Sequence, residues 1–391
     1  MTPSSYFTYA PTDKNGAHTQ RPANPADVLV SVIIPIYNAA PFLDQALDSV
    51  QAQTHKNLEI ICLNDGSTDN SLDIIRAHAA RDERIVIIDK QNQGYGATCN
   101  RGLDEAHGEW IAILEPDDWI EPGMYRDMLS FASTFNEPVE IIKTPYWRIS
   151  LPDTPRQRKL NCSYKKRVHV DKQPFVITDA IHLLHHHPSI WSAIYRKSFL
   201  NEHGIRFKPI PGAGWADNPF LVETLCRAQR IVYLDQAYYC YREETKEKTR
   251  AFHRNSPNVP FDRWNEMLDI IESLGITDER ILCAHYSRGF MYMSGVIEEN
   301  DPDDPAIHAQ LERMFNRMNP ELVYQYPRIS PGCRRLYAEV RGLPKPNVSH
   351  LQYASNLLEQ GVYNLRNIGI YGTLDSLGNY LIKYRRRTGG R

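Results

Sequence analysis

Three carboxylates stand within four residues at Glu115-Pro116-Asp117-Asp118, directly after the apolar run 110–114. That run is typical of a buried strand, so the acids are expected at the strand's C-terminal end. In open α/β sheets, ligands bind outside the carboxyl ends of strands, where carboxylates suit a hard divalent cation that also holds substrate phosphates. An acidic turn is also typical of a solvated loop, and the upstream residues bear on that choice.

Two other apolar runs end in polar side chains. The predicted strand 28–36 leads into Tyr37-Asn38, and the predicted strand 58–63 leads into the segment 64–69, Asn-Asp-Gly-Ser-Thr-Asp. The segment 92–96, Asn-Gln-Gly-Tyr-Gly, precedes a predicted helix, and its glycines allow the backbone to approach a ligand closely. Neither GxGxxG nor GxxxxGK[ST] occurs, so dinucleotide and P-loop chemistry are not supported.

The elements that must position these motifs alternate between strand and helix. Strands are predicted at 28–36, 58–63, 85–88, 110–114 and 139–143, and helices at 40–53, 71–80, 96–106 and 121–135. This alternation indicates βαβ units, and therefore an α/β fold with a mostly parallel sheet and flanking helices. Strand signals return at 189–195 and 231–234, and the pattern after about residue 255 is mostly helical.

The pattern suggests three parts of the chain. We expect a flexible N-terminal arm at 1–27, a catalytic α/β domain at 28–255 and a mostly helical C-terminal region at 256–391. Residues 145–180 interrupt the alternation and are interpreted as an insertion or an acceptor-side connection. The arm lacks the apolar core of a signal peptide, and no apolar run has the ~18 residues of a transmembrane helix.

Composition narrows the class of protein further. The net charge of −2 does not indicate a nucleic-acid partner. The seven cysteines are scattered and form no CxxC pair, which favours a reduced, cytoplasmic setting over a disulfide framework or a zinc site. A histidine tract at 182–187 lacks carboxylates at a suggestive spacing and is not interpreted as a metal site.

Taken together, the segments 32–38, 64–69, 92–94 with 100–102, and 114–118 resemble the family 2 glycosyltransferases of GT-A fold in order and spacing. The resemblance extends from about residue 29 to residue 244. It implies a nucleotide-diphospho-sugar donor, a divalent metal ion (Mn²⁺ or Mg²⁺) and inverting transfer.

The resemblance also implies a nucleotide-sugar site. It is formed by Pro35, Tyr37 and Asn38 at the base and ribose, Asp65 at the uracil or ribose, and Gly94, Asn100, Glu115, Asp117 and Asp118. For Asp65 the alternative is a turn or N-cap aspartate. Asp69 is expected to cap the helix 70–80.

The acidic segment is the implied metal site. Asp117 would hold the metal that neutralises the donor diphosphate. Glu115 stands where the family usually has aspartate, so its longer side chain is assigned to either the sugar or the metal. Asp118 is assigned to the sugar, or to support from a second layer.

The implied catalytic residue is Asp217. The segment 214–220 resembles the family's Glu-Asp-x-x-Phe element, although Ala216 replaces the glutamate. An acceptor hydroxyl that attacks the anomeric carbon must lose its proton, and Asp217 would accept it. The alternative is an ordinary helix N-cap.

Further candidates for the acceptor or the diphosphate are Trp191, Arg242, Lys248 and Arg250. The family often has a similar Tyr-Arg segment followed by a mobile loop, here 245–250. A core tryptophan and a solvated charge run are the alternatives.

The C-terminal stretch 364–391 is apolar at helix-like steps and ends in the basic segment 383–387. It is interpreted as a peripheral contact with an anionic membrane, with a packed helix or a homodimer contact as alternatives.

The sequence therefore predicts an inverting glycosyltransferase that uses a UDP-sugar and a saccharide or lipid-linked acceptor, in the synthesis of surface polysaccharide or lipooligosaccharide. It would be cytoplasmic or peripheral to the membrane. The alternatives are a nucleotidyltransferase, or a non-catalytic glycan-binding or scaffold protein on the same core.

Overall fold

The computed structural model describes residues 24–243, 246–301, 303–344 and 346, and parts of 351–374. Most of the expected arm and the basic segment 383–387 lie outside the described residues. The chain divides into two units. The first comprises residues up to 147, 164–242 and 269–275, and the second comprises 148–163, 243–268 and 276 onward. Residues 148–163 and 243–255 thus group with the helical region rather than with the α/β part.

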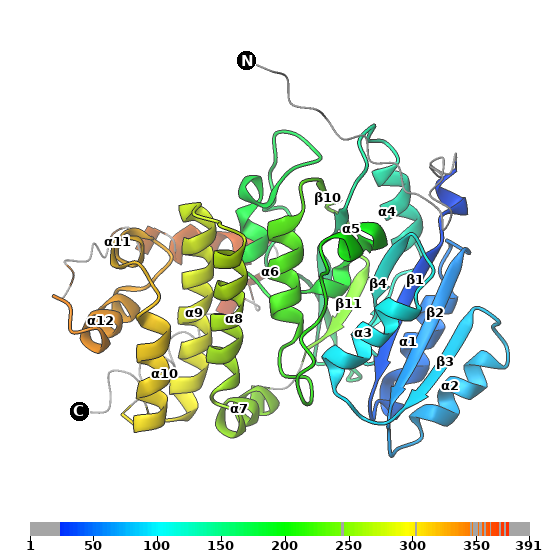
Figure 1. Cartoon of the computed structure of the whole chain (residues 1–391), viewed down its shortest axis with the longest axis horizontal. Helices are drawn as coiled ribbons and strands as arrows, with labels where there is room; N and C mark the ends of the chain where they lie inside the picture. Colours follow the sequence, from blue (N-terminus) through cyan, green and yellow to red (C-terminus); the bar gives the residue numbers. More distant parts are fainter. Residues whose placement is uncertain are drawn as a thin grey trace. The chain divides into compact units, whose positions relative to one another are not determined.

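The first unit contains a seven-stranded sheet (Figure 1). Its strand order is β10 (Ile231–Tyr233), β6 (Ile141–Lys143), β9 (Ala193–Arg196), β4 (Trp110–Ile113), β1 (Val30–Ile36), β2 (Leu58–Asp65) and β3 (Ile85–Lys90). β9 runs antiparallel to β4 and β6, and the other pairs are parallel. The expectation of a mostly parallel sheet is therefore confirmed.

The central strands are buried along their whole length. All seven residues of β1 and all four of β4 are buried. Strands covered on both faces by helices read as continuous β-branched and apolar runs, as these do. The sequence signal was strong here because burial on both faces leaves no polar alternation.

Six helices accompany this sheet along the chain. They are α1 (Ala40–Gln51), α2 (Ser71–Ala79), α3 (Tyr95–Glu105), α4 (Met124–Ala132), α5 (Lys197–Glu202) and α6 (Asp217–Arg227). Two short strands that the sequence analysis missed, β5 (Trp119–Ile120) and β11 (Tyr239–Arg242), pair antiparallel. They are too short to show a periodic pattern.

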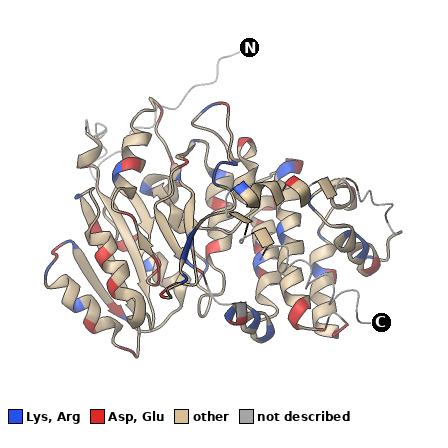
Figure 2. Cartoon of the chain, turned by 180° about the vertical axis from the view of Figure 1, so that it is seen from behind, with Lys and Arg blue, Asp and Glu red and all other residues tan. Residues whose placement is uncertain are grey.

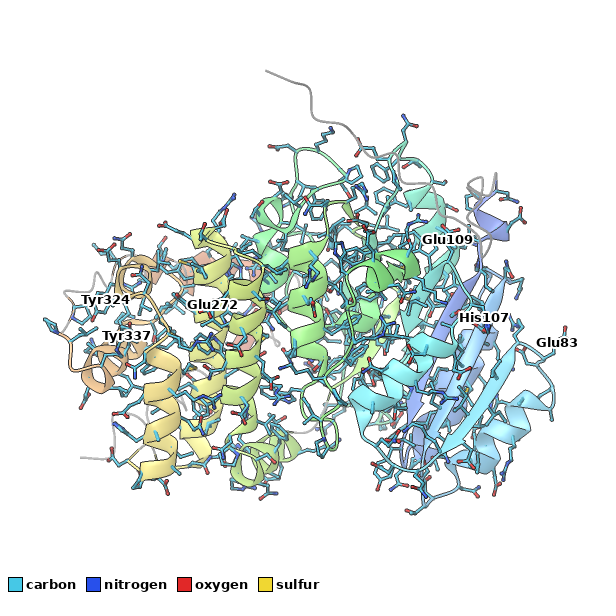
Figure 3. All side chains as sticks on the ribbon, in the orientation of Figure 1. Glu83, His107, Glu109, Glu272, Tyr324 and Tyr337 are labelled. Atoms are coloured by element: carbon cyan, nitrogen blue, oxygen red, sulfur yellow. The ribbon has the colours of Figure 1, made fainter. Side chains whose placement is uncertain are left out.

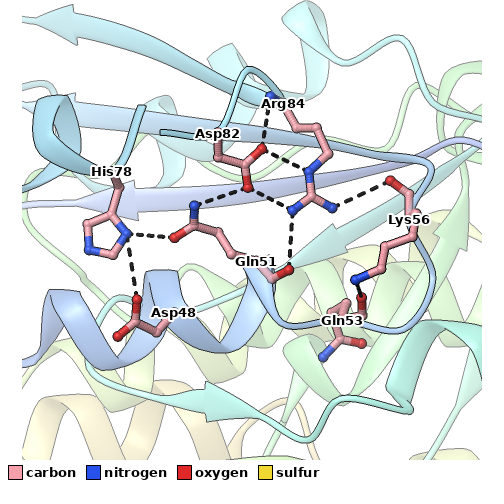
Figure 4. Close-up of polar contacts among 7 residues, drawn as sticks. All are labelled: Asp48, Gln51, Gln53, Lys56, His78, Asp82 and Arg84. Atoms are coloured by element: carbon pink, nitrogen blue, oxygen red, sulfur yellow. Dashed lines mark hydrogen bonds and ion pairs between the residues drawn. The ribbon is translucent and has the colours of Figure 1, made fainter. Parts of the chain in front are cut away.

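A polar network ties the amino-terminal edge of the sheet together (Figure 4). Gln51, at the end of α1, bonds His78 of α2 through Oε1 at 2.6 Å and Asp82 through Nε2 at 3.0 Å. Arg84 donates to Asp82 at 2.9 Å and to the Gln51 carbonyl at 3.2 Å. The hydrogen bond from Arg84 lowers the pKa of Asp82 well below its usual range. These contacts join the ends of α1 and α2 to the start of β3.

The second unit is mainly helical. It includes α7 (Lys246–Asn255), most of α8 (Val259–Ser273), α9 (Glu279–Glu299), α10 (Pro305–Phe315), α11 (Pro320–Gln325) and α12 (Pro331–Val340). α7 carries a run of basic residues (Figure 2). The strand β8 (Arg158–Asn161) also belongs to this unit, and β7 (Tyr146–Ser150) runs from the first unit into it.

Local sequence explains the starts of α10, α11 and α12. Each begins with proline, whose missing N–H is no loss in the first turn. The residue before each proline accepts a hydrogen bond from the first turn: Asp304, Asn319 and Ser330. Tyr324 and Tyr337, which are labelled in Figure 3, pack edge to face with their ring centroids 6.0 Å apart. This contact joins α11 to α12. Among the described residues, no helix combines the length and apolarity needed to cross a membrane.

Candidate active site

The strand order brings three polar strand ends together. β4, β1 and β2 are neighbours, and all three run parallel. Their carboxyl ends lead into Glu115, Tyr37 and Asp65 respectively, so these residues meet at one edge of the sheet. The expectation that the motifs share an edge is confirmed by this topology.

Asp65 fixes the glycine-containing segment that precedes α3. Its Oδ1 accepts hydrogen bonds from Lys90 and from the Gln93 N–H at 2.9 Å, and its Oδ2 accepts from the Gly94 N–H at 3.0 Å. Gly94 has a φ of +88°, and a Cβ there would meet the Ile210 carbonyl at 2.5 Å. Both the left-handed conformation and the close approach require glycine.

Tyr37 and Asn38 follow β1 with different exposure and contacts. Asn38 has a φ of +50°, and its Oδ1 accepts the Thr68 N–H at 2.8 Å. Tyr37 is 53% exposed, which is unusual for a large ring beside a buried strand. An exposed ring at the carboxyl edge offers a flat face for a planar group such as a nucleobase. Pro35 is buried within β1 and shapes the strand end rather than its surface.

Asp69 joins two helix starts. Its Oδ1 accepts from the Ser71 N–H at the start of α2, and its Oδ2 accepts from the Ala40 N–H at the start of α1, both at 3.0 Å. Asp69 thus bonds the first N–H of α2, although the N-cap of this helix is Asn70, one residue later than the prediction placed it. The second bond, to α1, could not be read from local sequence.

The acidic segment after β4 forms a turn, in which the Asp118 N–H donates to the Glu115 carbonyl at 3.2 Å. Burial raises the pKa of Glu115 to about 8, and the negative charges of Asp117 and Asp217 add to the rise. Burial also holds the pKa of Asp118 well above its usual range, and the Asp117 charge contributes. The carboxyl groups of the turn thus repel one another at a site with little access to water.

Asp118 is a support rather than an exposed ligand. Its side chain is 1% exposed, and its Oδ1 accepts the Arg242 N–H at 2.7 Å. Its buried Oδ2 has no well-aligned donor in the described part of the chain, although the Tyr239 hydroxyl lies near it. The role of Asp118 toward a donor stays a prediction.

Asp217 is the first residue of α6, where the helix dipole favours a negative charge. The Asn218 amide donates to its Oδ1 at 3.1 Å. The preceding Trp215 has a φ of +56°, so the chain turns sharply into the helix. Because its charge raises the pKa of Glu115, Asp217 lies within electrostatic reach of the acidic turn. The charges of Asp117 and Asp217 thus both act on Glu115 within the first unit, and we call these three residues the acidic cluster.

Sequence reasoning did not single out Tyr95, which contacts this cluster directly. Its hydroxyl donates to Glu115 Oε1 at 2.5 Å. Burial and the nearby charges raise the pKa of Tyr95 well above its usual value, so the ring stays a hydrogen-bond donor. The only sequence signal was its place between Gly94 and Gly96 in the motif before α3.

The side chains of two candidate residues are occupied by contacts within the protein. Asn100 on α3 donates to the Phe207 carbonyl at 2.7 Å and accepts from the Phe207 N–H at 2.8 Å. Trp191 is 3% exposed and stacks on Tyr239 at 4.0 Å and on Tyr241 at 5.2 Å. These contacts favour a structural role for Asn100, which holds the backbone of Phe207, and they favour a core tryptophan over a sugar contact for Trp191.

Arg242 is also engaged within the fold. It is 7% exposed, and its Nε donates to the Asp117 carbonyl at 2.8 Å. One terminal nitrogen donates to Gln45 Oε1 at 2.7 Å, and the guanidinium lies over the rings of Phe42 and Trp119. Arg242 therefore holds the acidic turn in place by hydrogen bonds to Asp117 and Asp118.

The segment expected as a mobile loop after Arg242 is helical from Lys246 onward, as part of α7. It contains neither glycine nor proline, and the Arg254–Glu247 ion pair at 2.6 Å supports a helix. Lys248 and Arg250 lie on α7 in the second unit, where Arg250 pairs with Glu299 at 3.4 Å.

The residues of the acidic turn fit a divalent cation that takes its other ligands from a substrate. Within the described residues, no three or more His, Cys, Asp or Glu side chains are grouped as a complete metal site. Mg²⁺ and similar ions are commonly held by one or two carboxylates plus substrate phosphates. A cation beside Glu115 and Asp117 would also relieve the repulsion that raises the pKa of Glu115.

Comparison with known proteins identifies the relatives of this chain. Residues 31–203 match the description of glycosyl transferase family 2. The putative glycosyltransferase EpsH of Bacillus subtilis is 28% identical over 227 residues, which is 54% of this chain and 60% of that protein. The glycosyltransferase GlyA of Streptococcus pneumoniae is 24% identical over 273 residues, which is 66% of this chain and 37% of that protein. The chain thus spans less than two thirds of these relatives' length.

A solved structure is similar over much of the chain. TarS of S. aureus, in complex with UDP-GlcNAc, has a TM-score of 0.62 and 19% identity, and the match covers 80% of this chain and 87% of that one. This likeness supports the GT-A fold that the motifs predicted.

Proposed function

We propose that this chain, whose residues 31–203 belong to glycosyltransferase family 2, transfers a sugar from a nucleotide-diphospho-sugar to an acceptor hydroxyl with inversion. The placement of Glu115 and Asp117 directly after β4, within electrostatic reach of Asp217 at the start of α6, carries the proposal. Such a transfer needs one acidic group at the donor phosphates and another to accept the acceptor's proton. The cluster supplies both kinds of group.

The donor's nucleotide is assigned to the edge formed by β1 and β2. Tyr37 offers an exposed ring to the base, and Asp65 and Asn38 shape the pocket around the ribose. We take the nucleotide to be UDP, since the TarS structures were obtained with UDP and UDP-GlcNAc. Gly94 would bring backbone close to the donor at the start of α3.

Asp117 and Glu115 would hold a divalent cation, Mn²⁺ or Mg²⁺. When bound, the cation neutralises the charge that develops on the departing diphosphate. The protein's own part is to keep the carboxylates in place. Arg242 contributes to this by donating hydrogen bonds to the Asp118 side chain and to the Asp117 carbonyl.

Asp217 is the proposed general base. Inversion in a single displacement requires a base that takes the proton of the attacking hydroxyl. Asp217 stands at a helix N-terminus, where the helix dipole favours a negative charge, and the Asn218 side-chain amide donates to one of its oxygens. An acceptor hydroxyl beside this carboxylate would pass its proton to it. The acceptor is a saccharide or lipid-linked glycan of a surface polysaccharide or lipooligosaccharide.

The proposed location is the cytoplasm or the inner face of a membrane. None of the seven cysteines, which all lie in the described residues, forms a disulfide. This state is typical of a reducing compartment.

The test is turnover of a panel of nucleotide sugars with Mn²⁺, followed as release of the nucleoside diphosphate with and without saccharide acceptors. Release from one donor, lost in the Asp217→Asn variant, is expected. Binding of nucleotide without release from any donor would favour the scaffold alternative, which the departures at Glu115 and Ala216 keep open.

A further inference from the structure

The hydrogen bond between Tyr95 and Glu115 joins a departure from the family's pattern, Glu115, to the start of α3. Glu115 stands where the resemblance leads one to expect aspartate, and Tyr95 lies between two glycines before α3. Their side chains meet at 2.5 Å, although they are 20 residues apart. The role inferred for this pair rests on the proposed transfer.

Tyr95 is itself held in place through both its backbone and its ring. Its N–H donates to the Gly212 carbonyl at 3.0 Å. Its ring packs edge to face against Phe207 at 5.9 Å, and Phe207 stacks on Phe220 of α6 at 4.1 Å. The hydroxyl therefore has little freedom, and its position is tied to the helix that begins with Asp217.

The length of the glutamate makes the contact possible. An aspartate at position 115 would be shorter by one C–C bond, about 1.5 Å. Without a backbone shift, its carboxylate would not reach the Tyr95 hydroxyl. The backbone is not free to shift, because the Glu115 N–H donates to the Tyr239 hydroxyl at 3.1 Å. Glutamate at this place is thus matched to tyrosine at position 95.

The bond engages one oxygen of the carboxylate. Tyr95 donates to Oε1, which leaves Oε2 for a cation. A flexible glutamate would lose side-chain freedom on binding the cation, and a carboxylate fixed in advance avoids that cost. The same bond keeps Glu115 from turning toward solvent when no donor is present.

We propose that Tyr95 is a positioning residue, which fixes Glu115 so that its second oxygen is ready for the cation of the metal–nucleotide complex. Tyr95 itself does not touch the donor or the metal. Its effect is transmitted through Glu115 alone, and this sets the form of the test.

The test measures UDP affinity by calorimetry with and without Mn²⁺ in the full chain. Tyr95→Phe removes the hydroxyl and keeps the ring that packs on Phe207. We expect the affinity with Mn²⁺ to fall about tenfold, as for the loss of a hydrogen bond to a charged group, and the affinity without Mn²⁺ to stay within about twofold. Glu115→Asp should give the same loss, and adding Tyr95→Phe to Glu115→Asp should have no further effect.

Tyr238→Phe is the matched control. Tyr238 donates to Asp127 Oδ2 at 2.9 Å, a tyrosine–carboxylate bond of the same kind in the same unit but outside the acidic cluster. It should leave Mn²⁺-dependent UDP affinity unchanged.

Wild-type affinity in Tyr95→Phe or in Glu115→Asp overturns the inference, as do additive losses in the double variant. If Tyr95→Phe does not fold, Glu115→Asp tests the same bond from its other end. A wild-type chain that binds no UDP under either condition contradicts the proposed function itself, whereas Mn²⁺-dependent binding with an unaffected Tyr95→Phe contradicts only the role of Tyr95.

Discussion

The Arg242 N–H donates to Asp118 Oδ1 at 2.7 Å, and the Arg242 side chain returns to the Asp117 carbonyl at 2.8 Å. One arginine, 124 residues further along the chain, thus bonds both aspartates of the turn. Its guanidinium also packs over Phe42 and Trp119. The acidic turn is therefore held by β11, a strand that the sequence did not reveal.

This relationship predicts that Arg242→Met lowers the stability of the fold more than it changes contacts with the donor. The variant keeps the backbone bond to Asp118 but loses the side-chain hydrogen bonds to the Asp117 carbonyl and to Gln45, together with the ring contacts. The expected cost is about 1–3 kcal/mol in the free energy of unfolding. Thermal melting of the metal-free protein measures it. Arg206→Met, at a half-exposed arginine paired with Asp104, is the control and should melt like the wild type. Unchanged melting with a large loss of UDP affinity would instead assign Arg242 to the diphosphate.

Asp217→Asn should lower the transfer rate by at least ~10²-fold, the effect of losing a general base, with little change in donor affinity. The amide keeps the size of the side chain but cannot take the proton. Glu223→Gln, on the same helix and paired with Arg227, serves as the control for a lost carboxylate. Steady-state kinetics separate the two effects. Transfer at the wild-type rate would move the role to another carboxylate.

Asp117→Ala should abolish transfer and weaken Mn²⁺-dependent UDP binding by at least about tenfold, since it removes a proposed ligand. The fold should persist, because the turn is bonded through Asp118 and the Asp117 main chain. Calorimetry with and without Mn²⁺ checks the affinity, and melting checks the fold. Asp104→Ala, at an exposed carboxylate on α3, is the control. Normal turnover of Asp117→Ala with metal present would remove it from the metal site.

The pKa of Glu115 predicts how stability depends on pH in the metal-free protein. The folded state raises this pKa from 4.5 to about 8, so the folded state binds the proton more tightly than the unfolded state. The contribution to stability is therefore present below pH 4.5 and is lost as the pH rises toward 8. Glu115→Gln cannot titrate, so its melting temperature should fall less than that of the wild type across this range. Identical pH profiles for the two proteins would contradict the assignment.

The basic segment 383–387, which lies outside the described residues, is predicted to bind anionic membranes. Each basic residue near such a surface contributes about 1 kcal/mol, and salt screens the attraction within about a Debye length. Co-sedimentation with anionic vesicles compares the full chain with a chain ending at Ile382, at low and high salt. The full chain should bind better, and only at low salt. Equal binding of both would leave the segment as a packing or dimer surface.

Sequence alone determined the elements and the motifs at their ends. The apolar runs of β1, β2 and β4 are strong because both faces of these strands are buried, and the side chains that follow them are local features. The resemblance to family 2 glycosyltransferases, and with it the expectation of a GT-A fold, followed from the order of those motifs. Asp69 as a helix cap was likewise local, since its partner Ser71 is two residues away.

Only the tertiary structure decided which of these side chains are accessible to a ligand and which are bonded to residues far away in the sequence. The order β4, β1, β2 places the three strand ends together, and periodicity within a strand carries no information on its neighbours. Asn100 is clamped by Phe207, 107 residues away, and Trp191 is covered by Tyr239 and Tyr241. The bond between Tyr95 and Glu115 depends on where α3 begins relative to β4. Such contacts form between segments that folding brings together, so their physical cause lies in packing rather than in the local pattern of the chain.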